Sequence, residues 1–101
     1  MMLVVTGVVE VNEAGVERAR EAAQQMVAET VKETGCLVYE FSQVLGHNTR
    51  FRVYEEWQDQ AALEAHFATP HMAVFRATLA EVGLISSEIY KIVGGEKQPL
   101  G

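Results

Sequence analysis

Two of the three histidines of this chain lie close together, in a short segment with several groups able to take up or release a proton. His66 follows Leu63 at helical spacing, so we expect its ring on the inward side of a helix. There a neutral imidazole could act as a general base or bind a substrate hydroxyl near pH 7. The alternative is a histidine at the edge of the core, satisfied by the backbone or by a glutamate.

The other two histidines are less informative. His71 follows Pro70 in the first turn of a predicted helix, where the positive end of the helix dipole disfavours its charged form; a surface cap residue is the alternative. Five-residue spacing does not place His66 and His71 on one face of a regular helix, and no third ligand is evident, so we expect no metal. His47 is expected to be solvated at a loop tip.

Glu55 is a carboxylate in an otherwise apolar strand face, since Phe51, Val53 and Trp57 share its parity. A buried carboxylate needs a partner and is a functional candidate when it lines a cleft; an ion pair or hydrogen bond to a neighbouring strand is the alternative. Tyr39 and Phe41 alternate on another strand and could form a wall for a planar substrate, although such a stripe is typical of a core.

The stronger signatures of metal, phosphate and nucleotide sites are missing from the sequence: there is no CxxC pair, HExxH, Gly-rich phosphate loop, GxSxG or acidic calcium loop. We therefore expect no cofactor. Cys36, the single cysteine, can form neither an internal disulfide nor a multi-cysteine metal site and is expected to be a buried, inert thiol. Arg76 could meet an anionic oxygen or simply solvate a helix flank.

Four β-branched or aromatic runs predict strands, at residues 2–11, 36–45, 50–57 and 84–93, with a hairpin loop at 46–49. Helical periodicity predicts a first helix capped by Asn12 and stopped by Lys32 and Gly35. A second helix is predicted from Asp59 through Ala68, and a third from Thr69-Pro70 to about Val82, ended by Gly83. The βαββαβ order indicates an α+β, ferredoxin-like fold, a four-stranded antiparallel sheet with the helices on one face.

The first strand is apolar on both faces. Leu3, Val5, Val9 and Val11 point one way and Met2, Val4 and Val8 the other, whereas a solvated face would carry polar residues. The last strand repeats this less cleanly. We therefore expect a homodimer in which uncovered sheet faces pack together.

Composition agrees with a single small domain, here residues 1–94, followed by a loose tail at 95–101. The chain has 101 residues, 49% of them hydrophobic, and a formal charge of −6. Its basic residues are scattered, so nucleic acid is not an expected partner. No apolar run could span a membrane and the first residues lack the features of a signal peptide, so we expect a cytoplasmic protein.

Three motifs in the centre of the chain resemble the antibiotic biosynthesis monooxygenase family. They are G-x3-Y-E from Gly35, F-x2-Y-E-x-W from Phe51 and L-x2-H-x3-P-H from Leu63. The resemblance implies a dimeric α/β barrel of ferredoxin-like subunits, each with a pocket between helices and sheet. It further implies oxidation of a quinol or polycyclic phenol by O₂ without metal, flavin or haem.

The resemblance also implies roles for individual residues. His66 would be the base or hydroxyl anchor, with Glu55 or His71 orienting it, and Arg76 could stabilise an oxyanion. Ring-packing walls would come from Tyr39, Phe41, Trp57, Phe67 and Phe75. A small-carbonyl isomerase of the same family and a non-catalytic dimeric ligand-binding module are the alternatives. The haem-degrading branch is disfavoured, because Arg76 stands where that branch has its haem-ligating histidine.

Overall fold

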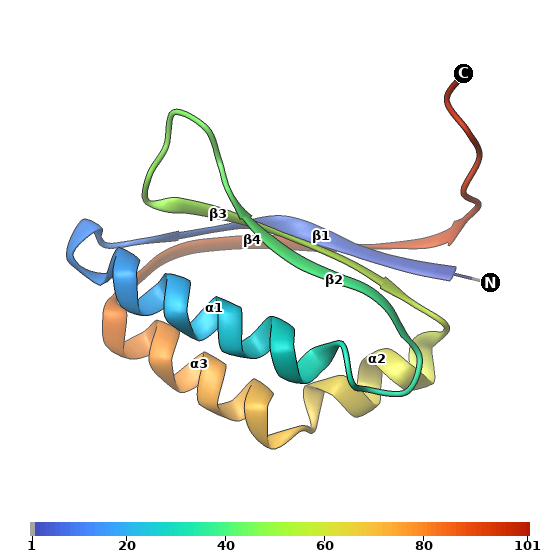
Figure 1. The fold of residues 1–101 in the computed structure, drawn as a ribbon, viewed down its shortest axis with the longest axis horizontal. Helices are drawn as coiled ribbons and strands as arrows, with labels where there is room; N and C mark the ends of the chain where they lie inside the picture. Colours follow the sequence, from blue (N-terminus) through green and yellow to red (C-terminus); the bar gives the residue numbers. More distant parts are fainter. Residues whose placement is uncertain (1) are drawn as a thin grey trace.

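The computed structural model describes residues 2–101 and contains one four-stranded sheet with helices against it (Figure 1). The elements, in chain order, are β1 (Met2–Val11), the 3₁₀ turn η1 (Glu13–Gly15), α1 (Val16–Thr30), β2 (Cys36–Gln43), β3 (Arg50–Trp57), α2 (Gln60–Phe67), α3 (Pro70–Val82) and β4 (Leu84–Gly95). The strand order is β2-β3-β1-β4, and every neighbouring pair is antiparallel. The predicted ferredoxin-like α+β fold is confirmed.

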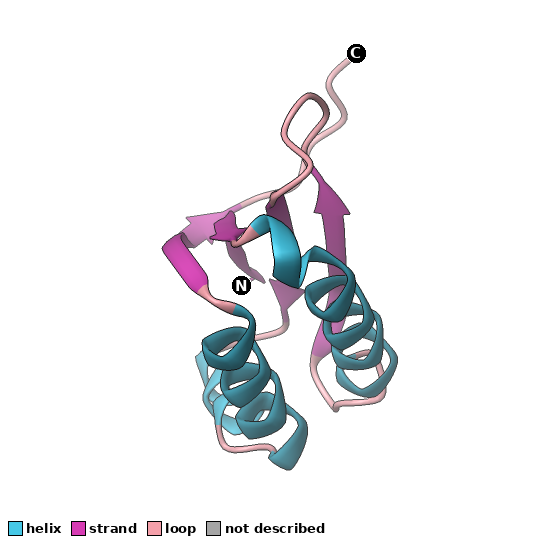
Figure 2. Ribbon diagram, turned by 90° about the vertical axis from the view of Figure 1, so that its left-hand side faces the viewer, coloured by secondary structure: helices cyan, strands magenta, loops and turns pink. Residues whose placement is uncertain are grey.

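All three α-helices lie on the same side of the sheet, and the opposite side carries no helix (Figures 1 and 2). The alternation along the central strand β1 explains this arrangement. Leu3, Val5, Val9 and Val11 are buried beneath the helices, as is Gly7, whereas the even-numbered residues of the strand are half-buried. The core therefore forms between one face of the sheet and the inner sides of α1 and α3.

The first helix begins later and ends earlier than the sequence suggested. Asn12 makes no side-chain cap bond to a helix; its backbone amide donates to the carbonyl of Gly83, and η1 separates it from α1. At the other end the amides of Lys32 and Glu33 bond three residues back rather than four, which closes the helix at Thr30. Lys32 and Gly35 therefore lie in the turn before β2.

The signals around the other two helices are confirmed. The Asp59 side chain accepts a hydrogen bond from the backbone amide of Ala62 and caps α2. Thr69 caps α3 in the same way, with Pro70 at its first position, and Gly83 ends α3 with a left-handed φ of +88°. The strand ends differ slightly, since β2 stops at Gln43 rather than at residue 45 and β4 continues to Gly95 rather than residue 93.

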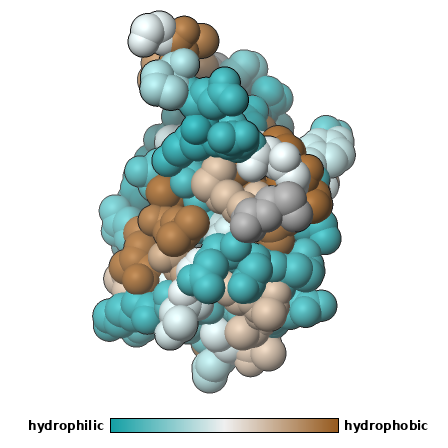
Figure 3. Space-filling model, turned by 90° about the vertical axis from the view of Figure 1, so that its right-hand side faces the viewer, coloured by the Kyte–Doolittle hydropathy of each residue, from teal (hydrophilic) through white to brown (hydrophobic). Residues whose placement is uncertain are grey.

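The edge strand β4 exposes apolar side chains from both of its faces. Ile89 pairs with Gly7 on the helix side of the sheet and is 45% exposed; Ile92 pairs with Val4 on the open side and is 49% exposed. Seen from the end where the C-terminal segment projects, apolar patches alternate with polar ones (Figure 3).

Among residues 2–101 no helix has the length and hydrophobicity needed to cross a membrane.

Candidate active site

His66 is the most deeply buried polar group near the junction of α2 and α3. It has 1% of its surface exposed, in the company of Leu63 on the inner side of α2. Its ring lies 4.8 Å from that of Trp57, at the end of β3, and 5.5 Å from that of Tyr39 on β2. Trp57 at the end of β3 and Tyr39 in the middle of β2 thus place two aromatic rings against the imidazole of His66.

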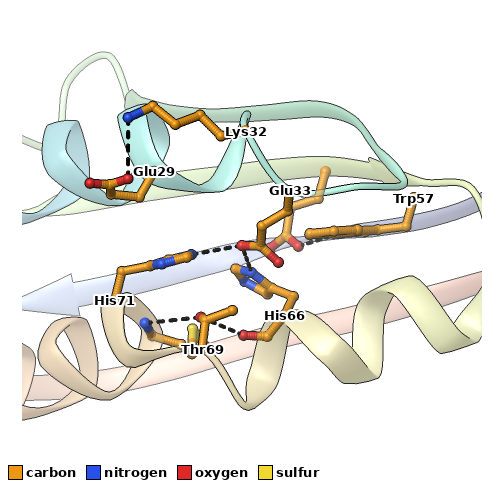
Figure 4. A network of polar contacts seen from close by, with 9 residues as sticks. Glu29, Lys32, Glu33, Trp57, His66, Thr69 and His71 are labelled. Atoms are coloured by element: carbon orange, nitrogen blue, oxygen red, sulfur yellow. Dashed lines mark hydrogen bonds and ion pairs between the residues drawn. The ribbon is translucent and has the colours of Figure 1, made fainter.

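Glu33 joins His66 to His71. It lies in the turn between α1 and β2, and its Oε2 is 2.8 Å from Nδ1 of His66 and 2.7 Å from Nε2 of His71 (Figure 4). The side chain of Glu33 is 13% exposed and that of His71 is 22% exposed. One carboxylate oxygen therefore holds two imidazoles, one fully buried and one reaching the surface.

The break between α2 and α3 makes this convergence possible. Thr69 Oγ1 donates to the backbone carbonyl of His66 and accepts from the amide of Met72, so it closes one helix and starts the next. His66 and His71 consequently sit on different helices. Their five-residue spacing, unsuited to a single regular helix, brings both rings to Glu33 across a helix boundary.

An ionised Glu33 can only accept hydrogen bonds, so two neutral histidines satisfy it by presenting Nδ1–H of His66 and Nε2–H of His71. Burial lowers the pKa of His66, although the hydrogen bond and the charge of Glu33 act in the opposite direction. The second nitrogen of each ring has no hydrogen-bond partner among residues 2–101. These nitrogens are the ones able to accept a proton.

Glu55 lies on the same side of the sheet but does not orient His66. Its Oε1 accepts a 2.7 Å hydrogen bond from Nε1 of Trp57, and it is 6% exposed. Burial raises the pKa of Glu55 to about 7; the bond from Trp57 lowers it and the charge of Glu33 raises it further. Glu33 makes the contact with His66 that the sequence suggested for Glu55, whereas Glu55 is hydrogen-bonded to Trp57, whose ring lies 4.8 Å from that of His66.

The other predicted site residues are aromatic rings near His66 and one arginine on α3. Phe41 packs edge-on against Tyr39 at 5.8 Å and lies 5.5 Å from Phe75, so these rings continue the aromatic wall. Phe67 is 45% exposed, with its ring 6.0 Å from that of His66. Arg76 is exposed on α3 and makes no ion pair within residues 2–101, although its charge lowers the pKa of His66.

Two further side chains near the cluster, those of Tyr39 and Cys36, have raised pKa values and stay protonated. Burial, followed by the charges of Glu55 and Glu33, strongly raises the pKa of the Tyr39 hydroxyl. Burial and the same two glutamates raise the pKa of Cys36, which is half-buried rather than fully buried as expected. A thiol that resists ionisation is a poor nucleophile.

Two grooves border the cluster. One of about 680 Å³ runs between α1 and β2, with walls from Tyr39, Phe41 and Phe51 and polar groups from Arg20 and Gln24. A second, of about 450 Å³, lies between α1 and α3 and is lined by His71, Phe75, Met26 and Val74. The larger groove meets the cluster only through Tyr39, whereas the smaller one contains a histidine.

Sequence reasoning missed Glu33. The residue stands in the mostly polar stretch Thr30–Thr34, where a carboxylate ordinarily faces solvent, and it lies three residues beyond the end of α1. Its one signal in the sequence is its place two residues before Gly35, where the first motif begins. The sequence offered no third metal ligand beside His66 and His71, and the Glu33 carboxylate is in the position of one. The ligand atoms of the three residues lie within 4.8 Å of one another.

The fold and the cluster together define a ferredoxin-like α+β protein with a largely buried group of two histidines and one glutamate between sheet and helices. The family model described as antibiotic biosynthesis monooxygenase matches residues 2–94, and the chain belongs to that family, which includes monooxygenases.

Known proteins resemble the chain over most of its length. A Deinococcus radiodurans structure given the same family's name has a TM-score of 0.92 at 21% identity and covers 98% of both chains. A Bacteroides thetaiotaomicron protein, offered as a candidate oxidoreductase, is 31% identical with a TM-score of 0.82, over 90% of this chain and 95% of that one. The uncharacterized protein sll1783 of Synechocystis is 30% identical over 72% of this chain, which spans only 50% of that relative's length.

Proposed function

We propose that this protein is a cofactor-independent monooxygenase that oxidises a quinol or another polycyclic phenol with O₂. The observation that carries the proposal is the pair of histidines held by Glu33 beside aromatic walls. A phenol becomes electron-rich enough to pass an electron to O₂ once it is deprotonated. The protein then needs to supply a base, an orientation and a site that excludes water.

The base is the histidine pair acting with its shared carboxylate. His71 is the member that a substrate in the groove between α1 and α3 can reach, because its side chain is 22% exposed. His66, the base suggested by the sequence, is linked to His71 through the Glu33 carboxylate, and its side chain is only 1% exposed. A proton taken up by His71 forms an imidazolium beside Glu33, and charge-assisted hydrogen bonding stabilises that state.

The reaction balances without an external reductant. One oxygen atom of O₂ forms a new C–O bond on the ring, and the other leaves as water with the two hydrogens removed from the quinol. The substrate supplies all four electrons. This stoichiometry separates monooxygenation from autoxidation, which reduces O₂ by two electrons and releases one H₂O₂ per quinol.

The test is oxygen uptake with a reduced naphthoquinone. We expect a rate well above that of buffer, with no H₂O₂ detected, and a large loss in both His66→Ala and His71→Ala. His47→Ala is the matched control, since His47 is exposed in the β2–β3 hairpin and should leave the rate unchanged. A rate equal to buffer autoxidation, or one unaffected by His66→Ala, would sink the proposal.

Two alternative functions give different outcomes in the same assay. A small-carbonyl isomerase would also use a histidine–glutamate cluster to move protons, but it would form product under anaerobic conditions. A binding module would turn over nothing, while a hydrophobic ligand would raise its melting temperature.

The working unit is proposed to be a homodimer formed through the open sheet face. Supporting this, β4 leaves Ile92 and Tyr90 exposed on that face, beside half-buried Val4 and Val8. A second copy would remove this apolar surface from water. Light scattering after size exclusion should show a dimer, and a stable monomer at micromolar concentration would contradict it.

A further inference from the structure

We infer that Glu33, His66 and His71 form a binding site for a divalent transition-metal ion such as Zn²⁺. The inference is independent of the proposed oxidation, because it concerns what three side chains bind in the absence of any substrate. It starts from the place in residues 2–101 where histidine, cysteine or carboxylate donor atoms from three separate segments converge.

The geometry needs little change to accept an ion. Donor atoms bound to Zn²⁺ lie roughly 2.1 Å from it, so two of them at a tetrahedral angle lie about 3.4 Å apart. Glu33 Oε2 is 2.8 Å from Nδ1 of His66 and 2.7 Å from Nε2 of His71, and all three donor atoms fall within 4.8 Å. The two contacts of Glu33 therefore widen by roughly 0.6 Å.

Two of the three ligands lie at the ends of elements, where the backbone is least constrained. Glu33 lies in the turn after α1 and His71 in the first turn of α3, so neither ligand is held inside a strand. His66 is fixed more firmly, between Trp57 and Tyr39. A rigid imidazole with two adjustable partners is a reasonable starting arrangement for metal binding.

The charge around the cluster favours a cation. Glu33 carries one carboxylate, and Glu55 is close enough for its pKa to be raised by the charge of Glu33. Arg76 on α3 opposes this, since its charge also reaches His66. The charges of Glu33, Glu55 and Arg76 sum to −1 once Glu55 has lost its proton, above a pH of about 7. A divalent ion would relieve the repulsion between two partly buried carboxylates.

The donor set selects the class of metal. Two imidazole nitrogens and one carboxylate oxygen suit Zn²⁺ and Fe²⁺, whereas Mg²⁺ and Ca²⁺ prefer sites made of oxygen atoms. Three protein ligands leave at least one coordination position open. His71 lines the groove between α1 and α3, so we expect a water molecule from the groove to occupy that position.

Metal binding and the proposed base would compete for the same atoms. An ion on Nδ1 of His66 and Nε2 of His71 replaces the two hydrogen bonds to Glu33, and each ring proton moves to the opposite nitrogen. Those opposite nitrogens are the ones that accept a proton in the proposed oxidation. An occupied site is therefore an inhibited one.

The test is a titration of the chelator-treated protein with Zn²⁺ against a chromophoric competitor, without substrate. We expect one Zn²⁺ per chain, and Glu33→Gln and His71→Ala should each weaken binding by at least about tenfold. His47→Ala is the matched control and should bind like wild type, and Mg²⁺ should not compete. Thermal melting of each apo variant checks that it folds.

Three results would overturn the inference: no Zn²⁺ bound by wild type, unchanged affinity in both Glu33→Gln and His71→Ala, or an equal loss in His47→Ala. A Co²⁺ titration gives a second readout, because ligand-field bands report imidazole coordination directly and should be missing in the Glu33→Gln and His71→Ala proteins. Failure here leaves oxygen uptake by the metal-free protein unaffected, so the two proposals fail separately.

Discussion

Replacing Glu55 by glutamine is expected to flatten the pH dependence of folding stability. In the folded chain burial raises the pKa of Glu55 from its ordinary 4.5 to about 7, against the bond from Trp57 and with the added charge of Glu33. The unfolded chain has the ordinary value, so between these two pH values the folded state keeps a proton that the unfolded state has released. Stability from this group is fully present below pH 4.5 and is lost as the pH rises through about 7.

The size of the effect follows from the two pKa values. The difference between 4.5 and about 7 corresponds to about 3 kcal/mol of unfolding free energy. His66 contributes a slope of the opposite sign, because its pKa is lowered on folding. That contribution is common to wild type and variant and cancels when the two profiles are subtracted. Glutamine keeps a side-chain oxygen that can accept from Trp57, so the packing changes little.

The assay is urea unfolding at a series of pH values and a fixed protein concentration. Trp57 is the single tryptophan and is fully buried, so its fluorescence reports unfolding. The matched control is Glu40→Gln, which removes an exposed carboxylate from the neighbouring strand and should leave the profile parallel to that of wild type. Parallel profiles for Glu55→Gln and wild type from pH 4.5 to about 8 would show that folding does not raise the pKa of Glu55.

Three further predictions concern the cap, the dimer and the metal. Thr69→Ala removes the cap of α3 and should lower the unfolding free energy by about 1 kcal/mol in urea; no change would mean that the cap bond is not maintained in solution. Ile92→Glu places a charge on the open face of the sheet and should shift the mass measured by light scattering toward that of a monomer. The control Ala80→Glu, at an exposed position on α3, should leave the mass unchanged. A dimer in both variants would place the interface elsewhere. Added Zn²⁺ should inhibit oxygen uptake and a chelator should restore it; activity abolished by the chelator alone would contradict a cofactor-independent reaction.

Local signals predicted most of the fold, because each acts over a few residues. Asp59, Thr69-Pro70 and Gly83 set the ends of α2 and α3 through bonds to backbone groups within one turn. The predicted cap at Asn12 was wrong, because Asn12 contacts Gly83, which is distant in the sequence. A Cβ on Gly83 would lie 2.0 Å from Nδ2 of Asn12, so that side chain packs on the turn after α3 instead of capping a helix.

The site was predictable only in part. The residue types at His66, His71 and Trp57 indicated a candidate site, and Pro70 indicated the break between the second and third helices. Glu33 was not, because its role depends on the turn after α1 meeting the junction of α2 and α3, more than thirty residues away in the chain. A contact of that kind follows from the tertiary structure and has no local pattern.

The most direct test of the account is the oxygen-uptake rate of Glu33→Gln with a reduced naphthoquinone. Glutamine keeps the size of the side chain but cannot hold two imidazole N–H groups with one charged oxygen. We expect the rate to fall on the order of 100-fold, while thermal melting shows that the variant is still folded at the assay temperature. Glu21→Gln, exposed on α1 and outside the groove that contains His71, should keep the wild-type rate. Equal rates in wild type and Glu33→Gln would contradict the claim that this carboxylate organises the catalytic histidines.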